Sequence, residues 1–141
     1  MGKRAVLILA AVAAAILASP TGEARAQALS YDYFKASVQP IFITKRPGHA
    51  RCIVCHAGAN NSMRLTPLAP GAKDFSEEQS RTNFTTVSGN VTPGKPMESH
   101  LLLHPLSPLA GGGLYHSGGR QFESIDDPDW KKIAAWVNGA K

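Results

Sequence analysis

Apolar residues recur at helical spacing soon after residue 30. Ser30 is a favoured helix N-cap, and Pro40, which has no backbone N–H, predicts a kink or break inside the helix that follows. The apolar positions at intervals of three and four residues are Phe34, Val38, Ile41 and Phe42. We therefore predict an amphipathic first helix that is distorted near its centre.

A second apolar stripe lies near the C-terminus. Asp127 is a favoured N-cap, Pro128 suits the first helical position, and Gly139 favours a helix end. The apolar residues that share one face of this segment are Trp130, Ile133, Ala134 and Val137. The pattern predicts a last helix that buries one face against the rest of the protein.

Two more helices are predicted between these segments. Residues 76–79 form a Ser-Glu-Glu-Gln capping box and predict a helix through about Val87, with Gly89 as its terminator. A shorter helix is expected over residues 97–104, because Pro105 cannot continue it. No segment alternates apolar and polar residues as a strand does, so we predict an all-α fold.

Glycine and proline punctuate the remaining chain. Pro67, Pro70 and Gly71 indicate one loop, and a long irregular loop is expected from residue 105 to residue 120. A short helical turn is expected over residues 50–57, because it would project the side chains of Cys52, Cys55 and His56 to one side.

The first 26 residues have the three-part layout of a secretory signal peptide. Basic residues precede an apolar run over residues 5–18, and the small-residue site Ala24-Arg25-Ala26 comes just before Gln27. We predict cleavage near Ala26/Gln27 and export to a bacterial periplasm, which leaves one domain over residues 27–141. The apolar run is shorter than the roughly 20 residues that span a bilayer, so no membrane span is expected in the mature chain.

The segment Cys52-Ile53-Val54-Cys55-His56 is a C-x-x-C-H pattern, which is typical of covalent haem attachment. Thiols at Cys52 and Cys55 can each add across one vinyl group, which places His56 beneath the iron as the proximal ligand. The second ring nitrogen of His56 then needs an acceptor, and we expect a backbone carbonyl near Pro67 or Pro70. The alternatives are a redox disulfide and half of a zinc site, but neither a βαβ pattern nor a second close ligand pair accompanies the motif.

The order of elements resembles a class I cytochrome c domain over residues 29–140: a helix with Phe34, the haem motif, a long Gly/Pro-rich loop and a helix with Trp136. The resemblance implies helices wrapped around one covalently bound haem c, with Phe34 and Trp136 in contact where the first and last helices cross. It also implies a sixth iron ligand, usually Met, on the late loop. Here that loop carries a His-x-Gly-Gly stretch, so we expect His116 to be the distal ligand; Met97, Met63 and an open site are the alternatives.

These features predict an electron-transfer protein and not an enzyme, because an iron with both axial positions filled has no free site for a substrate. We expect a one-electron carrier between redox proteins. The alternatives are a haem subunit of a larger oxidoreductase and a ligand-binding or peroxidatic haem protein with an open distal site.

The net charge and the remaining histidines indicate less about partners and binding sites. Removing the signal peptide lowers the net charge from +5 to +3, and no basic helix is present, so nucleic acid is not an expected partner. The group Lys45, Arg46 and Arg51 either steers an acidic redox partner or is a solvated loop. His100 and His104 share a helical face and either bind a metal ion or form the polar edge of a helix that packs its leucines inward.

Overall fold

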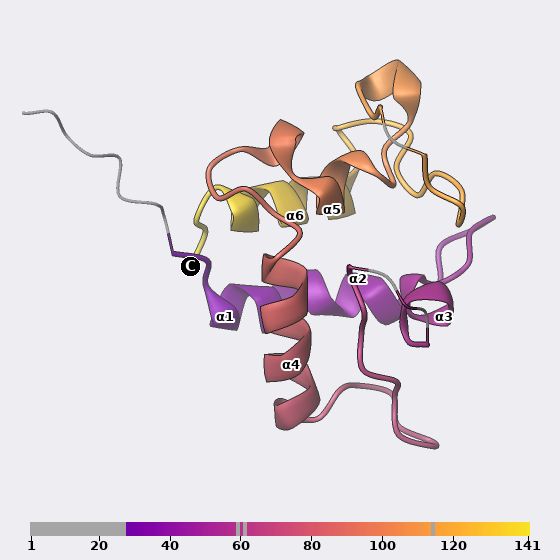
Figure 1. The fold of residues 1–141 in the computed structure, drawn as a ribbon, viewed down its shortest axis with the longest axis vertical. Coiled ribbons are helices and arrows are strands. Elements are labelled where there is room, and N and C mark those ends of the chain that lie inside the picture. The colour runs from indigo at the N-terminus through magenta and orange to yellow at the C-terminus, as the bar shows by residue number, and fades with distance from the viewer. Residues whose placement is uncertain (1–27, 59, 61, 114) are drawn as a thin grey trace, which may run out of the picture.

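The structure is a computed structural model that describes residues 28–58, 60, 62–113 and 115–141. The predicted signal peptide and its cleavage site at Ala26/Gln27 lie outside these residues. The described part of the chain is helical and has no strand, as the all-α prediction requires (Figure 1). No helix in it is long and apolar enough to cross a membrane.

The helical segments follow one another along the chain in a simple order. They are α1 (Tyr31–Tyr33), the π-helical segment η1 (Phe34–Val38), α2 (Gln39–Ile43), α3 (Cys52–His56), α4 (Glu77–Ser88), the 3₁₀ turn η2 (Pro96–Glu98), α5 (His100–Leu103), the 3₁₀ turn η3 (Pro108–Ala110) and α6 (Pro128–Val137). In Figure 1, α1, η1 and α2 form one rod. Helix α4 crosses that rod and extends below it in this view, whereas α5 and α6 lie above it.

The predicted distortion of the first helix is present, and it takes the form of a π-helical segment. The Ser30 hydroxyl caps the helix by accepting from the Tyr33 N–H at 3.2 Å. Five residues, Phe34–Val38, are π-helical, and the Gln39 N–H donates to the Phe34 carbonyl. Pro40 follows at once and has no N–H to donate, so the wider turn accommodates the missing bond while the helix continues.

The first and last helices pack against each other through two aromatic residues. The ring centroids of Phe34 and Trp136 are 5.3 Å apart, and both side chains are fully buried. The Trp136 indole N–H also donates to the Ser30 carbonyl at 2.9 Å. The predicted contact between these residues is confirmed, and it joins the two ends of the described chain in one core.

The capping box predicted for α4 is also confirmed. The Ser76 hydroxyl accepts from the Gln79 N–H at 3.2 Å, and the Gln79 amide oxygen accepts from the Ser76 N–H at 2.8 Å. The predicted helix over residues 97–104, in contrast, is interrupted: Pro96–Glu98 form the 3₁₀ turn η2, and His100–Leu103 form the short helix α5. The buried Ser99 hydroxyl accepts from the Thr92 N–H at 3.0 Å and donates to the Lys95 carbonyl, which holds residue 99 in an extended conformation between η2 and α5.

The Phe34–Trp136 contact predicts a large loss of stability on truncation. Phe34→Ala should lower the free energy of unfolding by about 3–5 kcal/mol, because it leaves a cavity at the helix crossing. Denaturant unfolding followed by circular dichroism measures the change. Leu109→Ala, at a fully exposed apolar position, is the control and should stay within about 0.5 kcal/mol of the parent. Equal effects of the two substitutions would contradict the assigned core.

Candidate functional site

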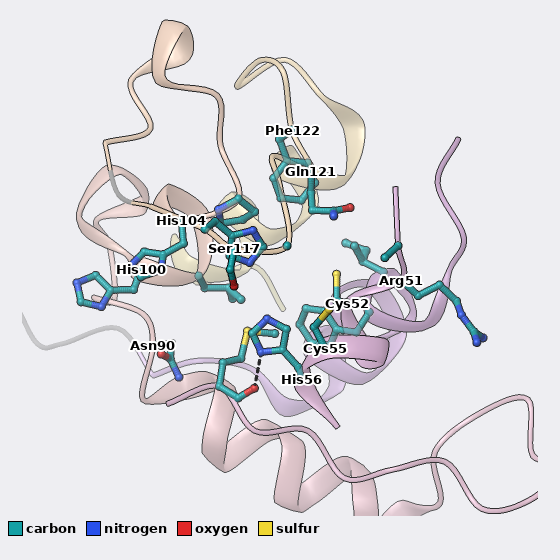
Figure 2. A pocket seen from close by; sticks show the side chains of 18 of the residues that line it. Arg51, Cys52, Cys55, His56, Asn90, His100, His104, Ser117, Gln121 and Phe122 are labelled. Atoms are coloured by element: carbon teal, nitrogen blue, oxygen red, sulfur yellow. Dashed lines mark hydrogen bonds between the residues drawn. The ribbon is translucent and has the colours of Figure 1, made fainter. Parts of the chain in front are cut away.

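A cavity of about 500 Å³ lies between α2, α3, α5 and the loop that precedes α6 (Figure 2). Its volume is typical of small-molecule and cofactor sites. Apolar side chains from several elements contribute to its wall, and they include Ile41, Phe42, Leu101, Phe122 and Ile133. The residues with ligand chemistry that line it are Cys52, Cys55, His56, His100, His104 and His116.

Helix α3 presents the C-x-x-C-H motif to this cavity. The predicted turn is formed, with Arg51 as N-cap and the Ala57 N–H donating to the Ile53 carbonyl at 2.9 Å. Ile53 is buried in the core, which fixes the helix so that Cys52, Cys55 and His56 share the cavity side. Figure 2 shows Cys52 and Cys55 at one end of the site, with His56 beside them toward its centre.

The orientation of the His56 ring is set by a backbone carbonyl. Nδ1 lies 2.9 Å from the Met63 carbonyl oxygen, and because a carbonyl can only accept, Nδ1 carries the proton. The neutral ring therefore has its lone pair on Nε2. The acceptor predicted near Pro67 or Pro70 is wrong: the Leu65 N–H bonds to the His56 carbonyl at 3.0 Å, so the chain folds back earlier and brings Met63 to the ring.

His116 stands on the loop between α5 and α6, and the loop is closed at its base. The Gln121 N–H donates to the Pro105 carbonyl at 2.8 Å, and the Ser107 N–H donates to the Phe122 carbonyl at 2.8 Å. The His116 ring is anchored like that of His56, because its Nδ1 lies 2.5 Å from the Gly119 carbonyl oxygen. Its Nε2 consequently carries the lone pair.

Each glycine of the His-x-Gly-Gly stretch is required by a different feature of the loop. Gly119 has φ = +78°, a left-handed conformation that favours glycine, and this turn brings its carbonyl to the His116 ring. A Cβ atom on Gly118 would lie 3.2 Å from Cε1 of His116, closer than ordinary van der Waals contact. The two glycines therefore permit one particular placement of the imidazole.

The structure brings His56 and His116 to a separation that suits one metal ion between them. Their ring centroids are 6.2 Å apart and their planes differ by 16°. A bond from imidazole nitrogen to metal is about 2.0 Å long and the ring centre lies about 1.1 Å behind the nitrogen, so two rings on opposite sides of one ion have centroids about 6.2 Å apart. Two Nε2 lone pairs, two thiols and an apolar wall fit a covalently attached haem.

The methionine alternatives are placed differently. Met97 does not line the cavity, its side chain is 45 % exposed, and its methyl carbon lies beside Gly111. Met63 lines the cavity and supplies the carbonyl that orients His56. The geometry favours His116 over both as the partner of His56.

His100 and His104 line the same cavity, which the sequence did not indicate. Leu101 and Leu102 are buried, so the expected inward packing of leucines is confirmed. The two imidazole centroids are 5.1 Å apart. Burial lowers the pKa of His104, and electrostatic repulsion by His100, His116 and Arg120 lowers it further.

The Cys52 thiol does not have the character of a redox-active nucleophile. Burial raises the pKa of Cys52 above its ordinary value, and this outweighs the lowering by the nearby Arg46 charge. A nucleophilic cysteine needs a lowered pKa, because the thiolate is the reactive form. The disulfide-exchange alternative therefore gains no support from the electrostatics of α3.

Arg46 has a structural task that the sequence did not reveal. Its guanidinium bonds to the carboxylates of Asp127 and Asp129 and lies 5.0 Å from the centre of the Phe122 ring. It thereby joins the segment before α3 to the end of the His116 loop and the start of α6. Because Arg46 is held in these partly buried contacts, the solvated-loop alternative is wrong for this residue, and the steering of an acidic redox partner stays a prediction.

Comparison of the chain with models of protein families, with curated proteins and with solved structures gives no match.

The Arg46 contacts predict a stability change that depends on pH. Burial alone would raise the pKa of Asp127, but the Arg46 bond and two backbone N–H groups of α6 outweigh it and hold that pKa below its usual value. A lowered folded-state pKa stabilises the protein above the unfolded-state pKa, and this stabilisation is lost as pH falls through the folded value. Arg46→Gln should lower the free energy of unfolding by about 1–3 kcal/mol at neutral pH.

The stability difference between Arg46→Gln and the parent should shrink as pH falls below about 4 and through the lowered folded-state pKa of Asp127, because the carboxyl group is then protonated in both states. Denaturant titrations over a pH series measure it. Arg64→Gln, at an exposed arginine, is the matched control and should change stability by no more than about 0.5 kcal/mol. A deficit that is constant down to low pH would show that the ion pairs are not its cause.

Proposed function

We propose that this chain is a monohaem c-type cytochrome of the periplasm that carries single electrons between redox proteins. The observation that carries the proposal is the pair of anchored imidazoles, His56 and His116, with centroids 6.2 Å apart in a cavity that also holds two thiols. The His-x-Gly-Gly loop adds support, because its backbone fixes an imidazole in place. The cytochrome c-like fold, with helices wrapped around the haem, is part of the same proposal.

Each side chain has a defined role in this proposal. The Cys52 and Cys55 thiols would each hold the haem through a thioether bond to one vinyl group, with the thiol hydrogen placed on the neighbouring vinyl carbon. The Nε2 atoms of His56 and His116 would hold the iron, and the Met63 and Gly119 carbonyls hold the two rings in orientation. The haem, when bound, supplies a one-electron Fe(III)/Fe(II) change.

The surroundings favour electron transfer over catalysis. With His56 and His116 on the iron, no position is open to peroxide or a diatomic gas. The apolar side chains that line the cavity exclude water and so limit the rearrangement that accompanies a change of charge. Ligation by two histidines also predicts a reduction potential below that of a His/Met site, because Met ligation raises it.

The first test is the visible spectrum of the mature chain, co-expressed with the machinery that attaches c-type haem. We expect covalently bound haem with low-spin bands in both oxidation states and no red Met-to-iron charge-transfer band. A red charge-transfer band would place a methionine on the iron, and a high-spin spectrum would indicate an open distal site. Absence of covalent haem would refute the proposal as a whole.

The second test removes the distal imidazole. His116→Ala should convert the ferric spectrum to high spin and allow the reduced protein to bind CO rapidly, because one axial position becomes free. Two controls, Met97→Leu at the alternative ligand and His49→Ala at a histidine outside the cavity, should leave the low-spin spectrum unchanged. Loss of the low-spin spectrum in Met97→Leu, together with an unchanged spectrum in His116→Ala, would show that Met97 and not His116 is the distal ligand.

A further inference from the structure

The proposed attachment through Cys52 and Cys55 fixes which way the haem faces within the cavity. The vinyl groups stand along one edge of the haem ring system, and the two carboxylate side chains stand along the opposite edge. In Figure 2 the two cysteines lie at one end of the site, and His100 and Asn90 lie at the other, with His56 between. A haem attached in this way would therefore direct its carboxylate edge toward His100 and Asn90.

His100 is the side chain at that end with a hydrogen-bond donor to offer. Asn90 uses its amide N–H groups on the Ser62 and Thr86 carbonyls, at 2.9 and 3.0 Å. The His100 imidazole is exposed and has no hydrogen bond to the described residues. A histidine ring has at least one N–H in either protonation state, so His100 can donate at any ordinary pH.

The charges around His100 favour an anion. No aspartate or glutamate lines the cavity among the described residues. Arg120 donates to the His104 carbonyl at 2.5 Å, and its positive charge acts on the neighbouring His104 ring. An anion is attracted to this region, whereas a cation would meet a positive charge and no carboxylate.

We propose that His100, backed by His104 and the charge of Arg120, binds the carboxylate groups of the haem. This inference rests on the proposed function and assigns two cavity histidines that iron ligation does not use. The rival occupant is a divalent metal ion. Two imidazoles on one tetrahedral ion have centroids about 5.1 Å apart, which is the separation of His100 and His104. The absence of carboxylate ligands and the nearby arginine decide against the cation.

The test compares His100→Leu with His49→Leu in the mature, haem-loaded protein. Each variant removes one imidazole, and His49 lies outside the cavity. Haem content is first measured by the alkaline pyridine spectrum. Resonance Raman spectroscopy then follows the bending band of the haem carboxylates, and a redox titration at fixed pH gives the midpoint potential.

We expect His100→Leu to shift the carboxylate band and to lower the midpoint potential, because carboxylates without a donor leave more negative charge near the iron. His49→Leu should change neither quantity. His100→Gln, which keeps an N–H donor, should restore the band toward its parental position and provides a second variant should the leucine fold poorly.

Two results would overturn the inference while leaving the proposed function intact: an unmoved band in His100→Leu with covalent low-spin haem present, or tight Zn²⁺ binding to the haem-loaded parent that His100→Leu abolishes. A protein with no covalent haem would overturn both.

Discussion

The central constraint on this structure is that two imidazoles, from residues 60 positions apart, lie 6.2 Å apart with nearly parallel planes and without touching each other. At 6.2 Å between centroids, no direct contact between the rings of His56 and His116 can hold the spacing. Each ring must be positioned from its own side, and each is, through a bond from Nδ1 to a nearby carbonyl of its own segment. The distance between the two rings therefore depends on how α3 is positioned relative to the loop of residues 105–122.

Arg46 and the helix crossing set that relation. Arg46 contacts Phe122 at the end of the loop and both carboxylates at the start of α6, while its own backbone leads into α3. The Phe34–Trp136 contact fixes α6 against the first helix, which continues toward α3. These contacts are partly or fully buried, so removing one partner leaves charge or apolar volume uncompensated. The cavity width thus depends on interactions outside the cavity.

Local signals explain what the sequence could predict. The Ser76 capping box, the Asp127–Pro128 helix start and the C-x-x-C-H turn each follow from a few adjacent residues, and all three are present. The predictions that were wrong involve residues whose bonding partners are distant in the sequence. Ser99 breaks a predicted helix because its buried hydroxyl bonds to Thr92, and Met63 is the acceptor for His56 because the chain folds back after α3. Helical spacing placed His100 and His104 on one face, but only the tertiary fold decides that this face lines the cavity.

The construction of the distal loop bears on why a histidine stands there. An imidazole has a second nitrogen that needs an acceptor, whereas a thioether sulfur makes no such demand. In this loop Gly119 adopts φ = +78° and directs its carbonyl at Nδ1 of His116, and Gly118 lacks the Cβ that would press on the ring. A methionine at this position could not donate a hydrogen bond to the Gly119 carbonyl. It would also not require the space beside the imidazole that the missing Cβ of Gly118 provides. The backbone is thus shaped for an imidazole, which on the proposed function holds the iron at a lower potential than a methionine would.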